Sequence, residues 1–171
     1  DNLKAVIPGG SSVPMLPGSV MRQDAIMDFD WLREQRSGLG TAAVIVMDQS
    51  TDVVKAVWRL AKFYKHESCG QCTPCREGSL WMAKALKRMR SGEARKGDAD
   101  YLKHIAQNIQ GRTICAFGEA CAWPVLSFVD KFRDDFEKRG AEDEARLAKR
   151  NGESMCWRRP SSSRRSTQPT C

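Results

Sequence analysis

The chain has 171 residues, of which 41% are hydrophobic, enough for one domain of ordinary size or two small ones with a real core. No apolar run approaches the ~20 residues of a membrane-spanning helix, so we expect no direct membrane insertion. The formal net charge is +7, and residues 151–171 supply +3 of it. The other charges are interspersed and do not alternate with aromatic residues, so we expect no nucleic-acid partner.

Residues 1–48 are rich in Gly, Pro and Ser between short apolar runs. Lys4 to Ile7 is typical of a short strand, which ends in the turn residues Pro8-Gly9-Gly10. Asp28 to Arg36 has brief helical spacing, and the longest apolar run, Ala42 to Met47, predicts a buried central strand. Two or three strands make a marginal sheet, so this segment is expected to be an incomplete α+β unit.

Residues 49–140 change to helical periodicity. Ser50 or Thr51 is expected to cap a first helix with Asp52 in its first turn. Three more amphipathic helices are predicted over Arg76–Arg90, over Asp98–Gln110, and from about Pro124, which suits a first turn. Four such helices with short connections favour a four-helix bundle. Residues 141–171 are expected to be a charged helix end followed, from residue 151, by a disordered basic Ser/Arg tail.

The cysteines carry the strongest chemical signal. Seven are present, an odd number, and Cys69, Cys72 and Cys75 lie within seven residues, which favours a metal centre in a reducing compartment over a disulfide framework. Two-residue spacings let three thiolates converge, and a Cys₄ cluster then needs a fourth ligand from elsewhere. The spacing alone leaves Cys115 and Cys121 as candidates for that ligand.

Other readings of these residues are weaker. Zinc sites usually present two separated ligand pairs, whereas three cysteines plus a distant one is more typical of a [4Fe–4S] cluster. A zinc-stabilised interaction module is nevertheless kept as an alternative. Nearby cations would raise the potential of an anionic cluster, although each could be an ordinary surface charge: Lys65, His66, Arg76 and Arg112. His104 has no motif around it.

The segment Gly38-Leu-Gly-Thr-Ala-Ala43 fits the dinucleotide fingerprint G-x-G-x-x-A. That fingerprint has meaning only between a strand and the start of a helix. Here it precedes a β-branched run, and no strand leads into it. We therefore expect a turn at this position.

Longer motifs resemble a known family. The stretches Ser37–Asp48, Phe63–Gly78, Thr113–Glu119 and Ala122–Val125 are similar to the C-terminal part of the NADH-binding flavoprotein subunit of respiratory complex I, the NADH:quinone oxidoreductase, and Ile7–Ser12 resembles its ubiquitin-like β-grasp insert. The similarity covers roughly residues 3–139. The basic tail matches nothing in the family, and Glu119 stands where Asp is more usual.

This resemblance implies an α+β fragment, with a partial β-grasp segment over residues 1–48 and a helical cluster-binding domain over residues 49–140. It implies that one [4Fe–4S] cluster is bound by Cys69, Cys72, Cys75 and Cys115. Electrons would pass from NADH through FMN to this cluster and on toward quinone. The NADH and FMN sites belong to a domain of the full-length subunit that is absent from these 171 residues, so the chain alone should not oxidise NADH.

The expected partners are other subunits of the hydrophilic arm, especially the thioredoxin-like [2Fe–2S] subunit and the large multi-cluster subunit. The expected location is the cytoplasmic side of the bacterial inner membrane, or the matrix side in mitochondria. The diaphorase subunits of NAD-linked hydrogenases and formate dehydrogenases share this module and are the nearest alternative. A nonfunctional gene fragment is a further one.

Overall fold

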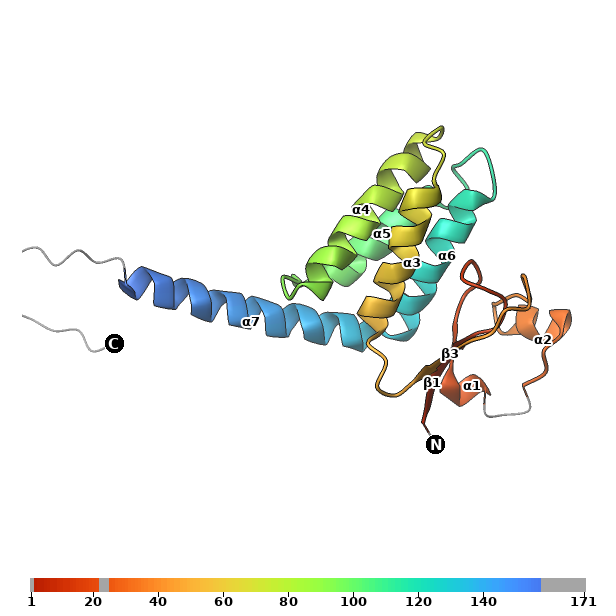
Figure 1. Ribbon diagram of the computed structural model, residues 1–171, viewed down its shortest axis with the longest axis horizontal. Helices are drawn as coiled ribbons and strands as arrows, with labels where there is room; N and C mark the ends of the chain where they lie inside the picture. Colours follow the sequence, from red (N-terminus) through yellow and green to blue (C-terminus); the bar gives the residue numbers. More distant parts are fainter. Residues whose placement is uncertain (1, 22–24, 158–171) are drawn as a thin grey trace, which may run out of the picture.

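The computed structural model describes residues 2–21 and 25–157, with side chains up to residue 150. Figure 1 shows a small sheet with two short helices beside a group of longer helices, from which the last helix extends away. The prediction of a small sheet followed by helices is therefore confirmed. Within the described ranges, no helix is both long and apolar enough to cross a membrane.

The sheet has three strands in the order β2-β1-β3, and both outer strands are antiparallel to the central one. The strands are β1 (Leu3–Ile7), β2 (Leu16–Pro17) and β3 (Ile45–Asp48), and the short helices are α1 (Gly18–Met21) and α2 (Phe29–Glu34). The prediction of a central buried strand at residues 42–47 is wrong. Because β3 pairs only with β1 among the described strands, it is an edge strand, and Val44 and Val46 are 51% and 64% exposed. Only Met47 in this run is buried.

The glycine-rich segments of the sheet unit cross each other backbone to backbone. A Cβ atom on Gly9 would lie 2.3 Å from the carbonyl oxygen of Gly38, and one on Gly40 would lie 2.1 Å from that of Gly9. The N–H of Thr41 donates to the carbonyl of Gly9 (3.0 Å), and the N–H of Gly10 donates to that of Ala43 (2.8 Å). The glycines of the G-x-G-x-x-A segment thus permit a close crossing, and the segment forms turns that lead into β3.

Four helices pack side by side: α3 (Val53–Glu67), α4 (Thr73–Arg90), α5 (Asp98–Ile109) and α6 (Phe117–Lys131). Three of the four expected helix starts are wrong, beginning with those of α3 and α4. Asp52 is itself the cap of α3, because its carboxylate accepts the N–H of Lys55 (3.1 Å). Helix α4 begins three residues earlier than Arg76, because Pro74 has a fixed φ that suits the first turn.

The C-terminal part differs most from expectation. Pro124 lies inside α6, which begins at Phe117, and the Ser127 hydroxyl donates to the carbonyl of Pro124 (2.9 Å). A proline mid-helix removes one backbone hydrogen bond, yet Ala122 and Val125 near it are buried, and their packing keeps the helix continuous. Phe132 separates α6 from α7 (Arg133–Trp157). The disorder expected from residue 151 is therefore wrong for 151–157, and residues 158–171 lie outside the described ranges.

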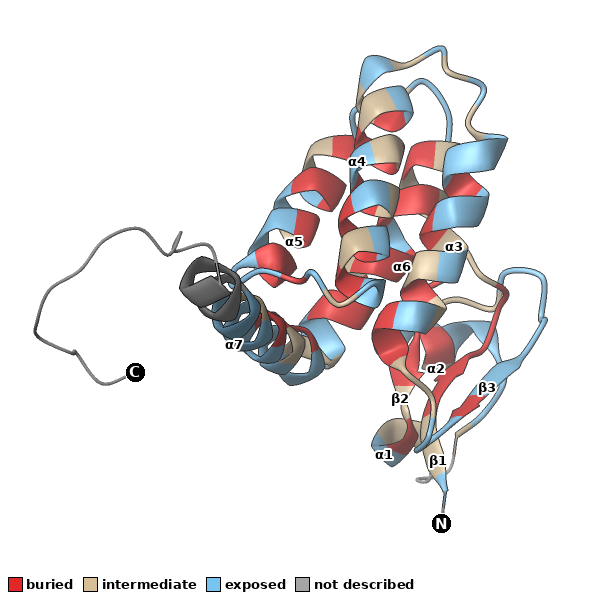
Figure 2. Ribbon diagram, turned by 60° about the vertical axis from the view of Figure 1, so that its left-hand side comes forward, coloured by how far each residue is buried: buried red, intermediate tan, exposed pale blue. Residues whose placement is uncertain are grey.

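One hydrophobic core joins the sheet to the helices. Ala5, Ile7 and Met47 from the strands belong to the same buried cluster as residues from α3, α4, α5 and α6. Figure 2 shows the buried residues concentrated between the helices, whereas the connections at their upper end are mostly exposed or intermediate. The α3–α4 and α5–α6 connections meet at that end (Figure 1). This brings together two segments that are about forty residues apart in the chain.

Candidate metal centre

The four predicted cysteines line one cavity at this end of the helices. Cys69, Cys72, Cys75 and Cys115 surround a volume of about 150 Å³, and Phe117 and Gly118 form part of its wall. This space is far larger than a single water-sized group needs. Among the described residues, no three His, Cys, Asp or Glu side chains converge closely enough to hold a single metal ion.

The α3–α4 connection and the first turn of α4 present the first three thiols. Gly70 has a left-handed backbone (φ +80°), and its carbonyl accepts a hydrogen bond from Arg76 Nη1 (2.9 Å). Cys72 is the N-cap residue of α4, and Cys75 lies in its first turn and is only 7% exposed. Both sulfur atoms therefore lie at the positive end of the helix dipole. A helix start at Arg76 would leave all three cysteines in a loop, whereas the observed start at Thr73 places Cys75 inside α4.

The α5–α6 connection brings Cys115 to the same cavity. The backbone N–H of Ile114 donates to Cys72 Sγ (3.2 Å), which ties this loop to the first three cysteines. Thr113 Oγ1 donates to the carbonyl of Cys115 (2.9 Å). Gly118 leaves room for Thr113, since a Cβ atom there would lie 2.1 Å from Thr113 Oγ1.

Cys121, the rival fourth ligand, is buried in α6 and is not among the residues that line the cavity. Burial, together with the nearby charge of Cys75, raises the pKa of the Cys121 thiol to about 12. A thiol with this pKa stays protonated at neutral pH and behaves as a small apolar residue. Its position therefore favours a packing role.

An aromatic contact that the sequence analysis did not single out connects the cavity wall to the sheet unit. The ring of Tyr64 packs edge-on against Phe117, with centroids 5.7 Å apart. The Tyr64 hydroxyl lies 2.8 Å from Ser11 Oγ, in the turn after β1, and burial raises the pKa of this tyrosine. The contacts of Tyr64 with two distant segments depend on the tertiary fold and have no local signal in the sequence.

The flanking polar residues have local partners. Arg76 binds the Gly70 carbonyl and also Glu77 (3.0 Å), so its charge lies beside the cysteine loop. Exposed His66 pairs with Glu67 (2.8 Å). Arg112 donates a hydrogen bond to Asn108 Oδ1 (2.7 Å), and His104 Nε2 lies 3.1 Å from Asn108 Nδ2. Lys65 is exposed. Among these residues, Arg76 is the cation linked most directly to a ligand-bearing segment.

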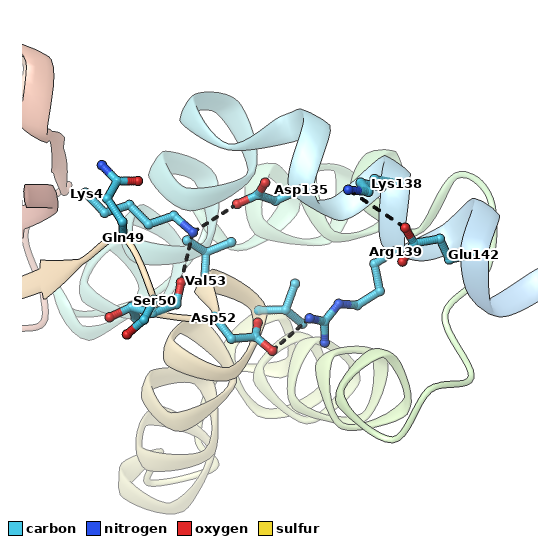
Figure 3. A pocket seen from close by; sticks show the side chains of 11 residues that line it. Lys4, Gln49, Ser50, Asp52, Val53, Asp135, Lys138, Arg139 and Glu142 are labelled. Carbon is cyan, nitrogen blue, oxygen red and sulfur yellow. Dashed lines mark hydrogen bonds and ion pairs between the residues drawn. The ribbon is translucent and has the colours of Figure 1, made fainter. Parts of the chain in front are cut away.

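A second hollow, of about 330 Å³, lies between the start of α3, β1 and α7 (Figure 3). Its charged side chains pair with one another: Lys4 with Asp135 (3.4 Å), and Arg139 with Asp52 (2.7 Å). Burial would raise the pKa of Asp52, but the Lys55 N–H and the Arg139 guanidinium outweigh it, and the net shift is downward. These ion pairs attach α7 to β1 and to the start of α3.

The sequence is similar to known respiratory proteins. Residues 55–139 match the family described as NADH-ubiquinone oxidoreductase-F iron-sulfur binding region. Over 139 residues, which are 81% of this chain, it is 61% identical to an F-type subunit of NADH-quinone oxidoreductase in Rhizobium meliloti. It is 57% identical to the mitochondrial NADH-ubiquinone oxidoreductase 51 kDa subunit of Aspergillus niger over the same length.

The structure is similar to part of a different enzyme. An NAD⁺-reducing [NiFe]-hydrogenase chain in the H₂-reduced state aligns with 81% of this chain at a TM-score of 0.70 and 29% identity, and 23% of that hydrogenase chain is covered. The present chain covers 32% of the Rhizobium protein and 28% of the Aspergillus protein. It therefore belongs to the family of F-type subunits of NADH-quinone oxidoreductase, and it spans about one third of the length of these relatives.

Proposed function

We propose that Cys69, Cys72, Cys75 and Cys115 bind one [4Fe–4S] cluster that carries electrons within an NADH dehydrogenase complex. The observation that carries this proposal is the shared cavity: four thiols from two distant connections line one hollow at one end of the helices. Such a cluster, when bound, accepts and releases one electron at a time.

The chain's own residues would hold and tune the cluster. The N-terminal end of α4 and the Ile114 N–H favour negative charge on the sulfur atoms of its ligands. The apolar side chain of Phe117 forms part of the cavity wall and limits the access of water there. Cys75, which also lines the cavity, is itself buried. Arg76 supplies a positive charge next to the loop, which favours the reduced form of an anionic centre.

The rest of the proposed path lies outside this chain. NADH and FMN would bind in the remaining two thirds of a full-length subunit, and electrons would leave toward quinone through other hydrophilic-arm subunits. Those partners would include the thioredoxin-like [2Fe–2S] subunit and the large multi-cluster subunit. The arm would face the cytoplasm in bacteria or the matrix in mitochondria.

The finer description of the fold is also a proposal. Residues 1–48 would be part of a β-grasp unit, and residues 49–140 a four-helix bundle that carries the cluster. The exposed apolar edge at Val44 and Val46 supports the first part, because a continuing sheet would cover it. The mutual contacts of α3, α4, α5 and α6 support the second.

A diaphorase role in an NAD-linked hydrogenase is the second candidate. The structural similarity to the NAD⁺-reducing [NiFe]-hydrogenase favours it. The higher identity to complex I subunits, 61% against 29%, favours the first reading. Affinity purification from the source cells distinguishes them, because the co-purifying subunits would carry either quinone-reductase or hydrogenase activity.

Anaerobic reconstitution of the full chain with iron and sulfide tests the cluster. We expect about four irons per chain and a rhombic EPR signal after dithionite reduction. Cys115→Ala should lose most of this signal, and the matched variant Cys121→Ala should retain it. A colourless protein with one bound zinc would overturn the cluster, and loss of signal only in Cys121→Ala would overturn the ligand set.

A further inference from the structure

The loop that carries Cys115 is closed by a carboxylate from the following helix. Helix α5 ends at Ile109, and Gly111 then adopts a left-handed backbone (φ +70°). The N–H of Gly111 donates to Glu119 Oε1 at 2.7 Å, a short distance for a bond between an amide and a carboxylate. Since Glu119 lies in the first turn of α6, this bond spans the whole connection.

The same loop has few other fixed points. The N–H of Arg112 bonds the carbonyl of Ile109 (3.1 Å), at the end of α5, and the N–H of Gly118 bonds the carbonyl of Cys115 (3.3 Å), at the start of α6. The Ile114 N–H reaches across to Cys72 Sγ. Of these bonds, only the one to Glu119 links the residues just after α5 directly to α6. Without it, the two ends of the loop would be joined only through the covalent chain and the helix packing.

We infer that Glu119 is a positioning residue that holds Cys115 at the cavity by accepting the Gly111 N–H. This inference rests on the proposed cluster site. The helix dipole favours the charge of Glu119 in the first turn of α6, but that charge does not explain why its carboxylate reaches back to Gly111. Its acceptor oxygen does, because Gly111 presents an N–H that α5 leaves free for an outside partner. Partners of this kind typically alter metal affinity by 10- to 100-fold when removed.

The test compares three variants of the full chain. Glu119→Ala removes the acceptor, and Glu119→Gln keeps an oxygen acceptor but removes the charge. The matched control is Glu144→Ala. Glu144 Oε1 also accepts a backbone N–H, that of Lys96 (2.8 Å), but this N–H lies in the α4–α5 connection and not in the loop that carries Cys115. Each protein is loaded with iron and sulfide anaerobically. The readouts are the rate of bleaching by a chelator, the g-anisotropy of the reduced EPR signal, and the urea midpoint.

We expect Glu119→Ala to bleach about tenfold faster with altered g-anisotropy. Glu119→Gln should stay within about twofold of wild type, and Glu144→Ala should lower the urea midpoint without faster bleaching. Equal bleaching of Glu119→Ala and wild type would overturn the inference, as would equal acceleration in Glu119→Ala and Glu144→Ala, or in both Glu119 variants. A wild-type chain that takes up no cluster would instead refute the proposed function.

Discussion

Replacing Gly9 by alanine tests whether the glycines of the sheet unit serve a backbone crossing. The added Cβ atom would lie 2.3 Å from the carbonyl oxygen of Gly38, against about 3.4 Å for ordinary contact. The two segments must therefore separate by roughly 1 Å. Neither the Cβ atom, which is fixed to the backbone of residue 9, nor the Gly38 carbonyl can rotate away.

The cost follows from what the separation breaks. Two backbone hydrogen bonds join the segments, from Thr41 to Gly9 (3.0 Å) and from Gly10 to Ala43 (2.8 Å). Each contributes about 1 kcal/mol net, and overpacking a tight site adds about 1–3 kcal/mol. We expect Gly9→Ala to lower the free energy of unfolding by about 3–5 kcal/mol.

Urea denaturation followed by circular dichroism measures this loss. The control is Gly97→Ala, because Gly97 has a left-handed φ of +88° and a Cβ atom there would meet nothing within 4 Å. Only the conformational cost of about 1–2 kcal/mol applies at that position. If Gly9→Ala cost no more than Gly97→Ala, the crowding argument would be refuted, and another role for the glycine pattern would have to be considered.

Three further predictions concern side chains around the core. In the cluster-free chain, Cys121 should destabilise the fold as pH rises from 9 toward 12, because the pKa of its thiol is about 9 in the unfolded chain and about 12 in the folded one. The Cys121→Ala variant should therefore show a smaller fall of the urea midpoint over this pH range. Asp52→Ala should cost about 1–2 kcal/mol at pH 7 through loss of the α3 cap and of the Arg139 pair. Since the Asp52 pKa is lowered in the fold, wild type should lose this advantage as pH falls below about 4. Tyr64→Phe should cost about 1 kcal/mol by removing the bond to Ser11, and should speed hydrogen exchange in the turn after β1.

Each of these has a contradicting result. An unchanged alkaline slope in Cys121→Ala would show that other groups control that pH range. A wild-type advantage over Asp52→Ala that stayed the same from pH 7 down to pH 2 would contradict the lowered pKa, because the ionisation of Asp52 would then contribute nothing to stability. Faster exchange throughout the helices of Tyr64→Phe, rather than in the turn alone, would show that the hydroxyl supports the whole core.

Helical periodicity predicted the four packed helices well, because each buries one apolar face along its length. Local chemistry predicted their starts less well. Pro74 and Pro124 can both begin a helix, yet only Pro74 lies in a first turn, and Pro124 is carried inside α6 by buried neighbours. Spacing placed three cysteines together, but their relation to Cys115 depends on how distant connections meet.

The sheet was predictable only in part. The composition of Val44 to Val46 suits a buried strand, and nothing in the sequence shows whether a neighbour covers it. Among the described strands, β3 pairs with β1 alone, which leaves its other side at the edge of the sheet. Tyr64 illustrates the same limit at the cavity, since its contacts with Phe117 and Ser11 join segments that are distant in the sequence.

The cavity lies at the tip of the helices, whereas the largest fully buried side chains, among them Phe128, Leu86 and Met82, fill the space between them. A zinc finger folds only around its metal, but here the apolar core is complete without the four thiols. We therefore expect the polypeptide to fold before iron is inserted. We expect the metal-free chain to be a durable species in iron-starved cells, ready to be loaded when supply returns.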